Sequence, residues 1–366
     1  MECKALQNQI VINNVGGSRN GLIKPCCSFN IFDPVSEDNI YNLSIDEARD
    51  KLNAINLNTK PESCKRCFIE EDLGIESNRL LYNNQFTGGQ KIESLQVAMD
   101  GVCNMACITC RPALSSTWNK IAKTSTIAQN EFYKFTNDGN KKYIETIKKR
   151  LDATDLSNLK YVRIGGGEPL YSKNSIDFIT NLKNKQNITL FVTTNGSIYP
   201  DQKLLDCFKE FNKVIIDFSI DGLDRLGSFM RQEVKWEVIN SNIEKFLNFR
   251  DHNNIELTTH GTITAINFNV LDDIVEYSNE RNMSSTFTLL HRPSYLYVAL
   301  LPLNFRKMVF STFKHQREKF RSISNMPQQD GIKKLHEYIL YIESQFGTKL
   351  KDANEEVYDI IYTNVS

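Results

Sequence analysis

The sequence predicts an α/β protein built from six strand–helix units, which suggests a barrel or a partial barrel. First, strand-like runs alternate with helix-like segments over residues 93–291, as in βαβ units with a parallel sheet. Second, Asp217, Ser219 and Asp221 share one face of an expected strand, and the residues between them are apolar. A polar strand face inside a helix-wrapped sheet indicates a ligand cavity, although an exposed edge strand would give the same pattern.

The expected elements follow from hydrophobic periodicity and turn residues. Strands are expected at Glu93–Met99, Tyr161–Ile164, Ile188–Thr194, Val214–Ile220, Ile255–Thr264 and Thr286–His291. Helices are expected at Ser115–Lys123, Tyr143–Leu151, Asn174–Lys183, Gln202–Phe211, Val234–Phe249 and Asn269–Arg281.

Two further regions flank this alternating part, so we expect segments 1–90, 91–300 and 301–366. The first is irregular in pattern apart from a helix-like stretch from Ser44 to Leu57, where Ser44 and Glu47 form a capping-box signature. The last is a helical cap, clearest at Phe310–Phe320 and Gly331–Phe346.

Composition excludes several classes of protein. The 44 Lys and Arg residues balance 44 Asp and Glu residues, which argues against binding to nucleic acid or to an acidic membrane. Neither a secretory signal pattern nor an apolar run long enough for a membrane span is seen, so we expect a cytoplasmic protein. The chain has nine cysteines, and in a reducing compartment clustered cysteines are typically metal ligands or catalytic groups.

Three of the cysteines form the pattern Cys103-x3-Cys107-x2-Cys110, directly after the first expected strand. Three thiolates can hold three irons of a [4Fe–4S] cluster and leave the fourth iron open for a chelating ligand. The alternatives are a zinc site with a borrowed fourth ligand, or buried structural cysteines.

Polar motifs also follow the next three expected strands. They are Gly165-Gly166-Gly167-Glu168-Pro169, Thr193-Thr194-Asn195-Gly196 and Ser219-Ile220-Asp221-Gly222. Each motif alone is typical of a turn. Their recurrence at successive strand ends indicates a site, because barrel sites are built at the carboxyl ends of strands.

These motifs, in this order, resemble the radical S-adenosylmethionine (radical SAM) superfamily over roughly residues 93–300. The resemblance implies a partial (β/α)6 TIM-like barrel, S-adenosylmethionine as a cofactor, and an open-iron [4Fe–4S] cluster at the catalytic Cys103, Cys107 and Cys110. It places the GGE motif at the amino group of S-adenosylmethionine, Ser219 near the ribose and Arg231 at the methionine carboxylate. The residues expected at the cofactor are Gly166, Gly167, Glu168, Pro169, Thr194, Asn195, Ser219, Asp221, Arg231 and Asn267.

The remaining clustered cysteines lie in the N-terminal region, where Cys26-Cys27 and Cys64-x2-Cys67 resemble the auxiliary-cluster modules called SPASM or twitch. Here the module precedes the barrel, as in a group of twitch-domain radical SAM proteins. The resemblance implies a second [4Fe–4S] cluster held by Cys3, Cys26, Cys64 and Cys67, with Cys27 spare or a substitute for Cys26. A zinc site is the alternative, because Cys-x2-Cys pairs bind zinc equally well. Cys207 lies in an apolar helical pattern and is expected in the core.

The function implied by the resemblance is reductive cleavage of S-adenosylmethionine to a 5′-deoxyadenosyl radical, which abstracts hydrogen from a substrate. By analogy with SPASM and twitch enzymes, that substrate is a peptide or protein side chain. The alternatives are the same chemistry on a small molecule, such as a nucleotide or sugar, and a non-catalytic iron–sulfur or zinc protein. An electron donor such as flavodoxin or ferredoxin is the expected partner, with no nucleic-acid or membrane partner.

Overall fold

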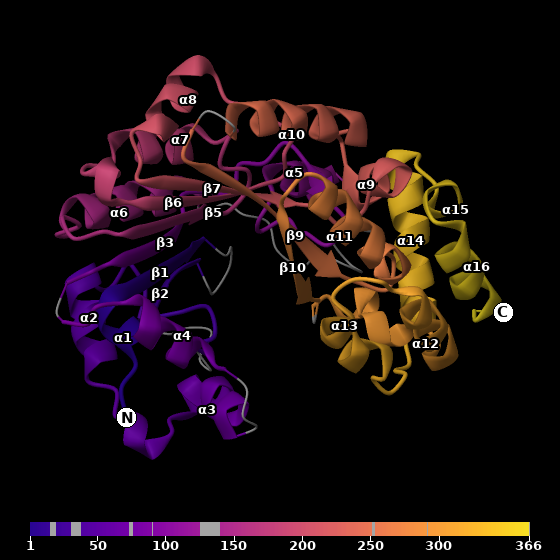
Figure 1. The fold of residues 1–366 in the computed structure, drawn as a ribbon, viewed down its shortest axis with the longest axis horizontal. Coiled ribbons are helices and arrows are strands. Elements are labelled where there is room, and N and C mark those ends of the chain that lie inside the picture. The colour runs from indigo at the N-terminus through magenta and orange to yellow at the C-terminus, as the bar shows by residue number, and fades with distance from the viewer. Residues whose placement is uncertain are drawn as a thin grey trace.

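A computed structural model describes residues 1–14, 20–30, 38–72, 76–89, 91–124, 140–250, 253–290 and 292–365. Its main feature is an eight-stranded sheet in the order β10-β9-β7-β6-β5-β3-β1-β2 (Figure 1). Neighbouring strands are parallel except for β1 and β2, and the two edge strands of the sheet are β10 and β2. The strands are β1 (Gln9–Asn14), β2 (Asn20–Lys24), β3 (Ser94–Ala98), β5 (Tyr161–Gly165), β6 (Thr189–Thr194), β7 (Lys213–Ser219), β9 (Ile255–Ile263) and β10 (Ser284–Leu289).

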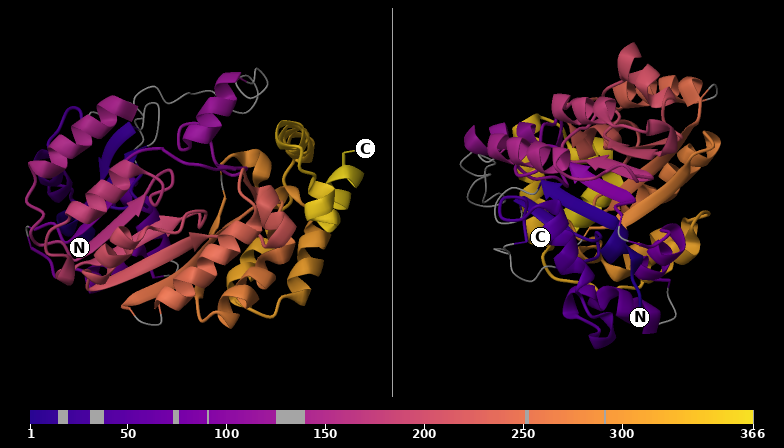
Figure 2. Two further views of the ribbon diagram at one scale, coloured as in Figure 1. Left: turned by 90° about the horizontal axis from the view of Figure 1, so that it is seen from above. Right: turned by 90° about the vertical axis from the view of Figure 1, so that its left-hand side faces the viewer.

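Helices alternate with the strands from β3 onward, which confirms the predicted α/β fold with its partial barrel. Figures 1 and 2 show α6, α7, α8 and α10 along one face of the sheet. The helices of this part are α5 (Ser116–Thr124), α6 (Asn140–Asp152), α7 (Lys173–Asn181), α8 (Gln202–Lys209), α9 (Asp224–Met230), α10 (Trp236–Arg250) and α11 (Leu271–Glu280). All six predicted strands are present, although His291, the expected end of the last one, lies outside the described residues.

The helix-covered face of the sheet is apolar, and the opposite face, called the inner face below, is polar. In β6, Leu190 and Val192 are fully buried under the helices, while Thr193 on the inner face is half-buried. On the neighbouring strand Asp217 turns to the inner face, where it contacts Thr193 and Thr258. Cys207 of α8 is buried, which agrees with its expected place in the core.

The N-terminal region is more regular than the sequence predicted. Strand β1 pairs in parallel with β3, so the sheet continues into this region, and the side chains of Ile10 and Ile12 are almost completely buried. The expected capping box is present at Ser44 and Glu47, but its helix α2 ends at Asn53 and not at Leu57. The other helices here are α1 (Lys4–Asn8), α3 (Lys65–Asp72) and α4 (Asn78–Gln85).

The C-terminal region is helical, as predicted, but the expected single helix over Phe310–Phe320 is wrong. The chain breaks between two helices because the Asp272 carboxylate accepts hydrogen bonds from the backbone N–H groups of Lys314 and His315, at 2.9 and 2.8 Å. The helices are α12 (Leu303–Thr312), α13 (Arg317–Ser324), α14 (Ile332–Phe346), α15 (Leu350–Ala353) and α16 (Glu355–Thr363).

One hydrophobic cluster runs from Leu6 in α1 to Ile361 in α16. We therefore propose segments 1–90, 91–300 and 301–366 as regions of one packed unit.

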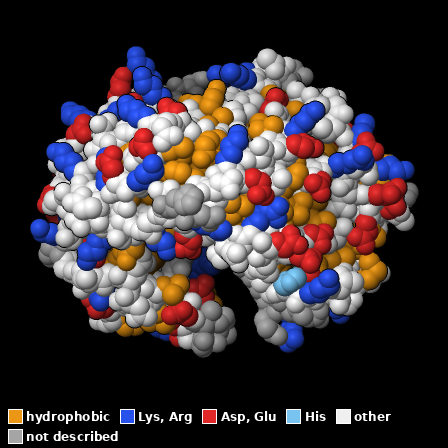
Figure 3. Space-filling model, turned by 45° about the horizontal axis from the view of Figure 1, so that its top comes forward, with side chains coloured by type: hydrophobic (Ala, Val, Ile, Leu, Met, Phe, Trp, Pro, Cys, Tyr) orange, Lys and Arg blue, Asp and Glu red, His pale blue; other side chains and the backbone are white. Residues whose placement is uncertain are grey.

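In the part of the chain that the structure describes, no helix has the length and apolar character needed to cross a membrane. On the face shown in Figure 3, Lys and Arg side chains are interspersed with Asp and Glu, and the molecule is hollowed at its lower edge.

Candidate active site

The three-cysteine loop leaves the sheet after β3 and is fixed at both ends. The Ser116 and Thr117 hydroxyls donate to the Cys103 carbonyl at 2.9 and 2.8 Å, which ties the loop to the start of α5. Farther along, β4 (Ala106–Cys107) pairs in antiparallel fashion with β8 (Arg231–Gln232), and Cys107 lies opposite Arg231. This two-residue ladder brings an arginine to the loop from another part of the barrel.

Hydrogen-bond donors point at two of the three sulfurs. The Arg231 guanidinium lies 3.6 Å from Cys107 Sγ through Nη1 and donates to the Asp221 carboxylate at 2.8 Å through Nη2. Its Nε is buried without a hydrogen-bond partner. On the other side, Asn195 Nδ2 lies 3.9 Å from Cys103 Sγ. Donors of this kind stabilise a sulfur that carries negative charge, which is the state of a thiolate bound to iron.

Burial disfavours the charged form of all three thiols. Burial raises the pKa of Cys103 and of Cys110 to about 12. It also raises the pKa of Cys107, although the charge of Arg231 opposes the shift. Iron would have to displace these protons, which is the usual coupling between metal binding and thiol ionisation.

The residues present fit a multi-iron cluster. Three thiols lie on one loop, two polar groups are directed at their sulfurs, and the Nε of Arg231 has no hydrogen-bond partner. Among the described residues, no three side chains of His, Cys, Asp or Glu are grouped as they would be around a single metal ion.

The glycine-rich turn after β5 packs directly on this loop. A Cβ atom at Gly167 would lie 2.2 Å from the carbonyl oxygen of Val102, and one at Gly166 would lie 2.6 Å from that of Asp100. Gly166 also has φ of +109°, which favours glycine. The backbone of Gly166 is exposed beside the cysteine loop, so it can approach a ligand there.

Glu168 lies inside the protein and is only 1% exposed. Its carboxylate accepts hydrogen bonds from the Asn195 backbone N–H at 2.6 Å, the Thr194 hydroxyl at 2.7 Å and the Leu170 N–H at 3.0 Å. Burial raises its pKa, and these hydrogen bonds oppose the shift. The resemblance places the GGE motif, which includes Glu168, at a ligand amino group; in the structure, Glu168 and Thr194 also join the ends of β5 and β6.

Asp221 and Asn267 belong to a second internal network, at the ends of β7 and β9. The Asp221 carboxylate accepts from the Thr262 backbone N–H at 2.7 Å and from Arg231. Asn267 is completely buried; its amide donates to the Asp221 carbonyl at 2.8 Å and accepts from the N–H and hydroxyl of Thr264. Asn267, which the resemblance places among the cofactor residues, fixes a turn and holds Asp221 in place.

Two expected cofactor residues lack such networks. Ser219 is half-buried on the inner face, beside His260 in the sheet register, and Pro169 is buried. Sequence reasoning missed Ser197 and Trp118. Ser197 accepts a hydrogen bond from Asn104, and Trp118 Nε1 donates to the Cys107 carbonyl at 2.8 Å. Neither residue carries a periodic or motif signal that could have identified it.

The N-terminal cysteines form a separate site. Cys3, Cys26, Cys64 and Cys67 line one small cavity, together with Arg79 and Tyr82 among others. Burial raises the pKa of Cys3 to about 11 and of Cys26 to about 12, and it raises the pKa values of Cys64 and Cys67. Cys27 does not line this cavity; it is exposed, with Asn78 Nδ2 at 3.8 Å.

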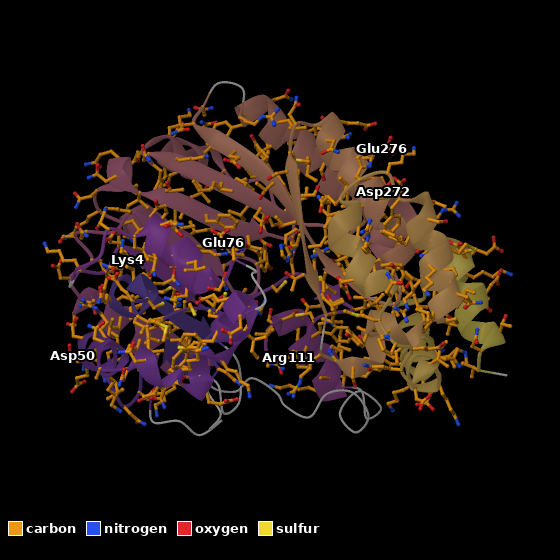
Figure 4. The ribbon with its side chains drawn as sticks, turned by 60° about the horizontal axis from the view of Figure 1, so that its bottom comes forward. Lys4, Asp50, Glu76, Arg111, Asp272 and Glu276 are labelled. Carbon is orange, nitrogen blue, oxygen red and sulfur yellow. The ribbon has the colours of Figure 1, made fainter. Side chains whose placement is uncertain are left out.

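The two cysteine sites lie at opposite ends of the strands. Cys3 precedes α1 and the start of β1, and Cys26 follows the end of the antiparallel β2, so both lie at the amino-terminal edge of the parallel strands. The three-cysteine loop follows the carboxyl end of β3. Figure 4 shows Arg111, the residue after Cys110, between the N-terminal region with Lys4 and the part of α11 with Asp272.

A cavity of about 580 Å³ between α6 and α7 is lined by none of the expected site residues.

Together these features describe an α/β partial barrel with a three-thiol loop at the carboxyl ends of its strands. Comparison with known families agrees: residues 100–278 match the family described as "Radical SAM superfamily". The matched segment contains the three-cysteine loop, the glycine-rich turn and Arg231.

The two curated relatives described here are named for the same activity. A GTP 3',8-cyclase of Campylobacter lari is 26% identical over 202 residues, which cover 54% of this chain and 56% of the relative. A probable GTP 3',8-cyclase of Archaeoglobus fulgidus is 22% identical over 263 residues, covering 69% of this chain and 74% of the relative. The match thus spans little more than half the length of the Campylobacter lari enzyme.

Solved structures are more distant. The structure described as native anSMEcpe with bound AdoMet has a TM-score of 0.43 and 18% sequence identity, and the match covers 64% of this chain and 63% of that chain.

Proposed function

We propose that this chain is a radical SAM enzyme. The observation that carries the proposal is the convergence of Cys107, Arg231 and the Gly166–Glu168 turn at one edge of the sheet, within the segment that matches the superfamily. When bound, an open-iron [4Fe–4S] cluster supplies one electron to S-adenosylmethionine, whose cleavage gives methionine and the radical that removes hydrogen from a substrate.

The chain's own residues would orient the cofactor and hold the loop. The exposed backbone of Gly166 is available to the amino group of S-adenosylmethionine, and the Arg231 guanidinium to its carboxylate. Glu168 and Asn267 would act indirectly, by fixing the strand ends that carry these groups. The side-chain amide of Asn195 would donate to the sulfur of Cys103, one of the expected cluster ligands.

For the substrate, the small-molecule alternative has more support than the peptide expected from the sequence. The relatives with a named function are GTP 3',8-cyclases, whose name specifies a nucleotide. The inner face of the sheet between the two cysteine sites is also polar. His260 is hydrogen-bonded on both ring nitrogens, to Thr286 at 2.9 Å and to Thr288 at 3.0 Å.

A second group of polar side chains lies around Asp217 on the same inner face of the sheet. The buried Asp217 carboxylate accepts from Thr258 at 2.8 Å and lies 3.5 Å from Arg163, whose guanidinium stacks 4.0 Å from the Phe191 ring centre. Hydroxyls, an imidazole, a carboxylate and a guanidinium suit a ligand with many hydrogen-bonding groups, such as a nucleotide or sugar.

The substrate assignment is tested with anaerobically reconstituted protein, S-adenosylmethionine and dithionite. GTP, other nucleotides and nucleotide sugars are added separately, and a peptide fraction from a lysate is added in parallel. We expect one small molecule to accelerate 5′-deoxyadenosine formation and, when deuterated, to transfer deuterium into it. Acceleration by the peptide fraction alone would contradict the small-molecule assignment.

We also propose that Cys3, Cys26, Cys64 and Cys67 bind an auxiliary [4Fe–4S] cluster. The support is their common cavity and the exclusion of Cys27 from it. The test is iron, sulfide and zinc analysis of a variant in which Cys103, Cys107 and Cys110 are all replaced by Ala. Iron and sulfide retained in equal amounts support the auxiliary cluster, whereas zinc without iron would contradict it.

A further inference from the structure

We propose that the C-terminal helix α14 is part of the cluster site and that Tyr338 is a positioning residue for the loop carrying Cys107 and Cys110. The Tyr338 hydroxyl donates a 2.7 Å hydrogen bond to the backbone carbonyl of Ile108, which lies between these two cysteines. The side chains of Tyr338 and Ile108 are both completely buried. The inference rests on the proposed function, because it concerns how that cluster is held.

A second contact of α14 acts on the neighbouring peptide indirectly, through Trp118 of α5. Trp118 Nε1 donates to the Cys107 carbonyl, and the buried Trp118 ring meets the Phe346 ring of α14 edge to face, with ring centres 5.6 Å apart. The Ile108 N–H donates to the Met230 carbonyl at 3.0 Å. The carbonyls of Cys107 and Ile108 and the N–H of Ile108 are therefore all hydrogen-bonded, and α14 helps to hold the two carbonyls.

A third contact comes from the residues just after α14. Gln232 Nε2 donates to the Thr348 hydroxyl at 2.8 Å, and Gln232 lies opposite Ala106 in the ladder that presents Arg231 to Cys107. Figure 1 shows α14 beside α9, the helix that leads into this ladder. Three separate contacts thus join the C-terminal region to the thiol loop and to its arginine.

These contacts have a consequence for the bound cluster. The orientation of ligating cysteines and the dipoles around them set the potential of an iron–sulfur cluster. Removing the Tyr338 hydroxyl leaves the Ile108 carbonyl without its donor and frees the peptide between two ligands. Removal of this hydroxyl should then change the spectrum and the potential of the cluster, and not only the stability of the chain.

The test compares Tyr338→Phe with Tyr358→Phe, which removes a hydroxyl from α16 of the same C-terminal region. Both full-length proteins are reconstituted and reduced anaerobically, and electron paramagnetic resonance spectra are recorded with and without S-adenosylmethionine. Only a cluster with an open iron changes its spectrum when S-adenosylmethionine binds to it. For Tyr338→Phe we expect a shifted responsive signal, a shifted midpoint potential and an about tenfold slower formation of 5′-deoxyadenosine, whereas Tyr358→Phe matches the unmodified protein.

An unchanged signal and potential in Tyr338→Phe, with only a lower melting temperature, would overturn the proposal, because the residue would then be merely structural. If Tyr338→Phe does not fold, Phe346→Leu loosens the Trp118 contact and should shift the same signal; an unshifted signal in that variant would also overturn it. Absence of any responsive signal in the unmodified protein would instead refute the proposed function, so the two failures are distinguishable.

Discussion

The substitution Glu168→Gln tests the internal role of this carboxylate. If the Gln oxygen keeps the hydrogen bonds from Thr194 and Leu170, its NH2 group must face the Asn195 N–H, donor against donor. A hydrogen bond to a charged group contributes about 1.5–3 kcal/mol, and a buried unsatisfied N–H costs about 1–3 kcal/mol. Because removal of the charge also relieves a desolvation cost, we expect a net loss of about 2 kcal/mol in the free energy of unfolding.

The assay is thermal and denaturant unfolding of the metal-free protein, so that no cofactor contributes to the difference. Glu210→Gln is the control, because Glu210 is an exposed glutamate paired with Lys185 at 3.0 Å. We expect Glu168→Gln to unfold a few degrees lower and Glu210→Gln to behave as the unmodified protein. Unchanged stability together with lost binding of S-adenosylmethionine would refute the reasoning, because Glu168 would then contact the ligand directly.

Three other predictions concern ligands, packing and local structure. Cys26→Ser should lower the iron content of the N-terminal site while Cys27→Ser leaves it unchanged, because only Cys26 lines the cavity; equal losses would contradict this assignment. Gly167→Ala should lower the iron content of the three-cysteine loop without removing a ligand, whereas Gly165→Ala, whose Cβ meets nothing within 4 Å, should not; iron analysis that ranks them equally would count against the packing described. Ser44→Ala should cost about 1 kcal/mol in unfolding free energy through loss of the α2 cap, and no measurable change would contradict the capping role.

The convergence of the strand-end motifs could be predicted from the sequence. Carboxyl ends of parallel strands meet at one edge, so the cysteine loop, Gly166, Asn195 and Asp221 had to lie near one another once the strands were assigned. What these side chains do there was less predictable. Spacing along the chain does not show that the Glu168 carboxylate accepts hydrogen bonds from Thr194 and Asn195, at the end of the next strand.

The parts that could not be predicted depend on contacts between distant segments. Strands β4 and β8 have two residues each, too few for any periodicity, yet their pairing places Arg231 at Cys107. The break between α12 and α13 depends on Asp272, about 40 residues earlier in the chain. The apolar run that becomes β1 was overlooked because its burial depends on pairing with β3, on the other side of the N-terminal region.

The most direct test of the central claim is the formation of 5′-deoxyadenosine and methionine by the reconstituted, dithionite-reduced protein with S-adenosylmethionine. The account predicts that the unmodified protein forms both products, and that Cys107→Ser forms neither although it keeps the iron of the N-terminal site. If a fully reconstituted unmodified protein forms no 5′-deoxyadenosine, or if Cys107→Ser forms as much as the unmodified protein, the assignment of the three-cysteine loop as the site of this chemistry is contradicted.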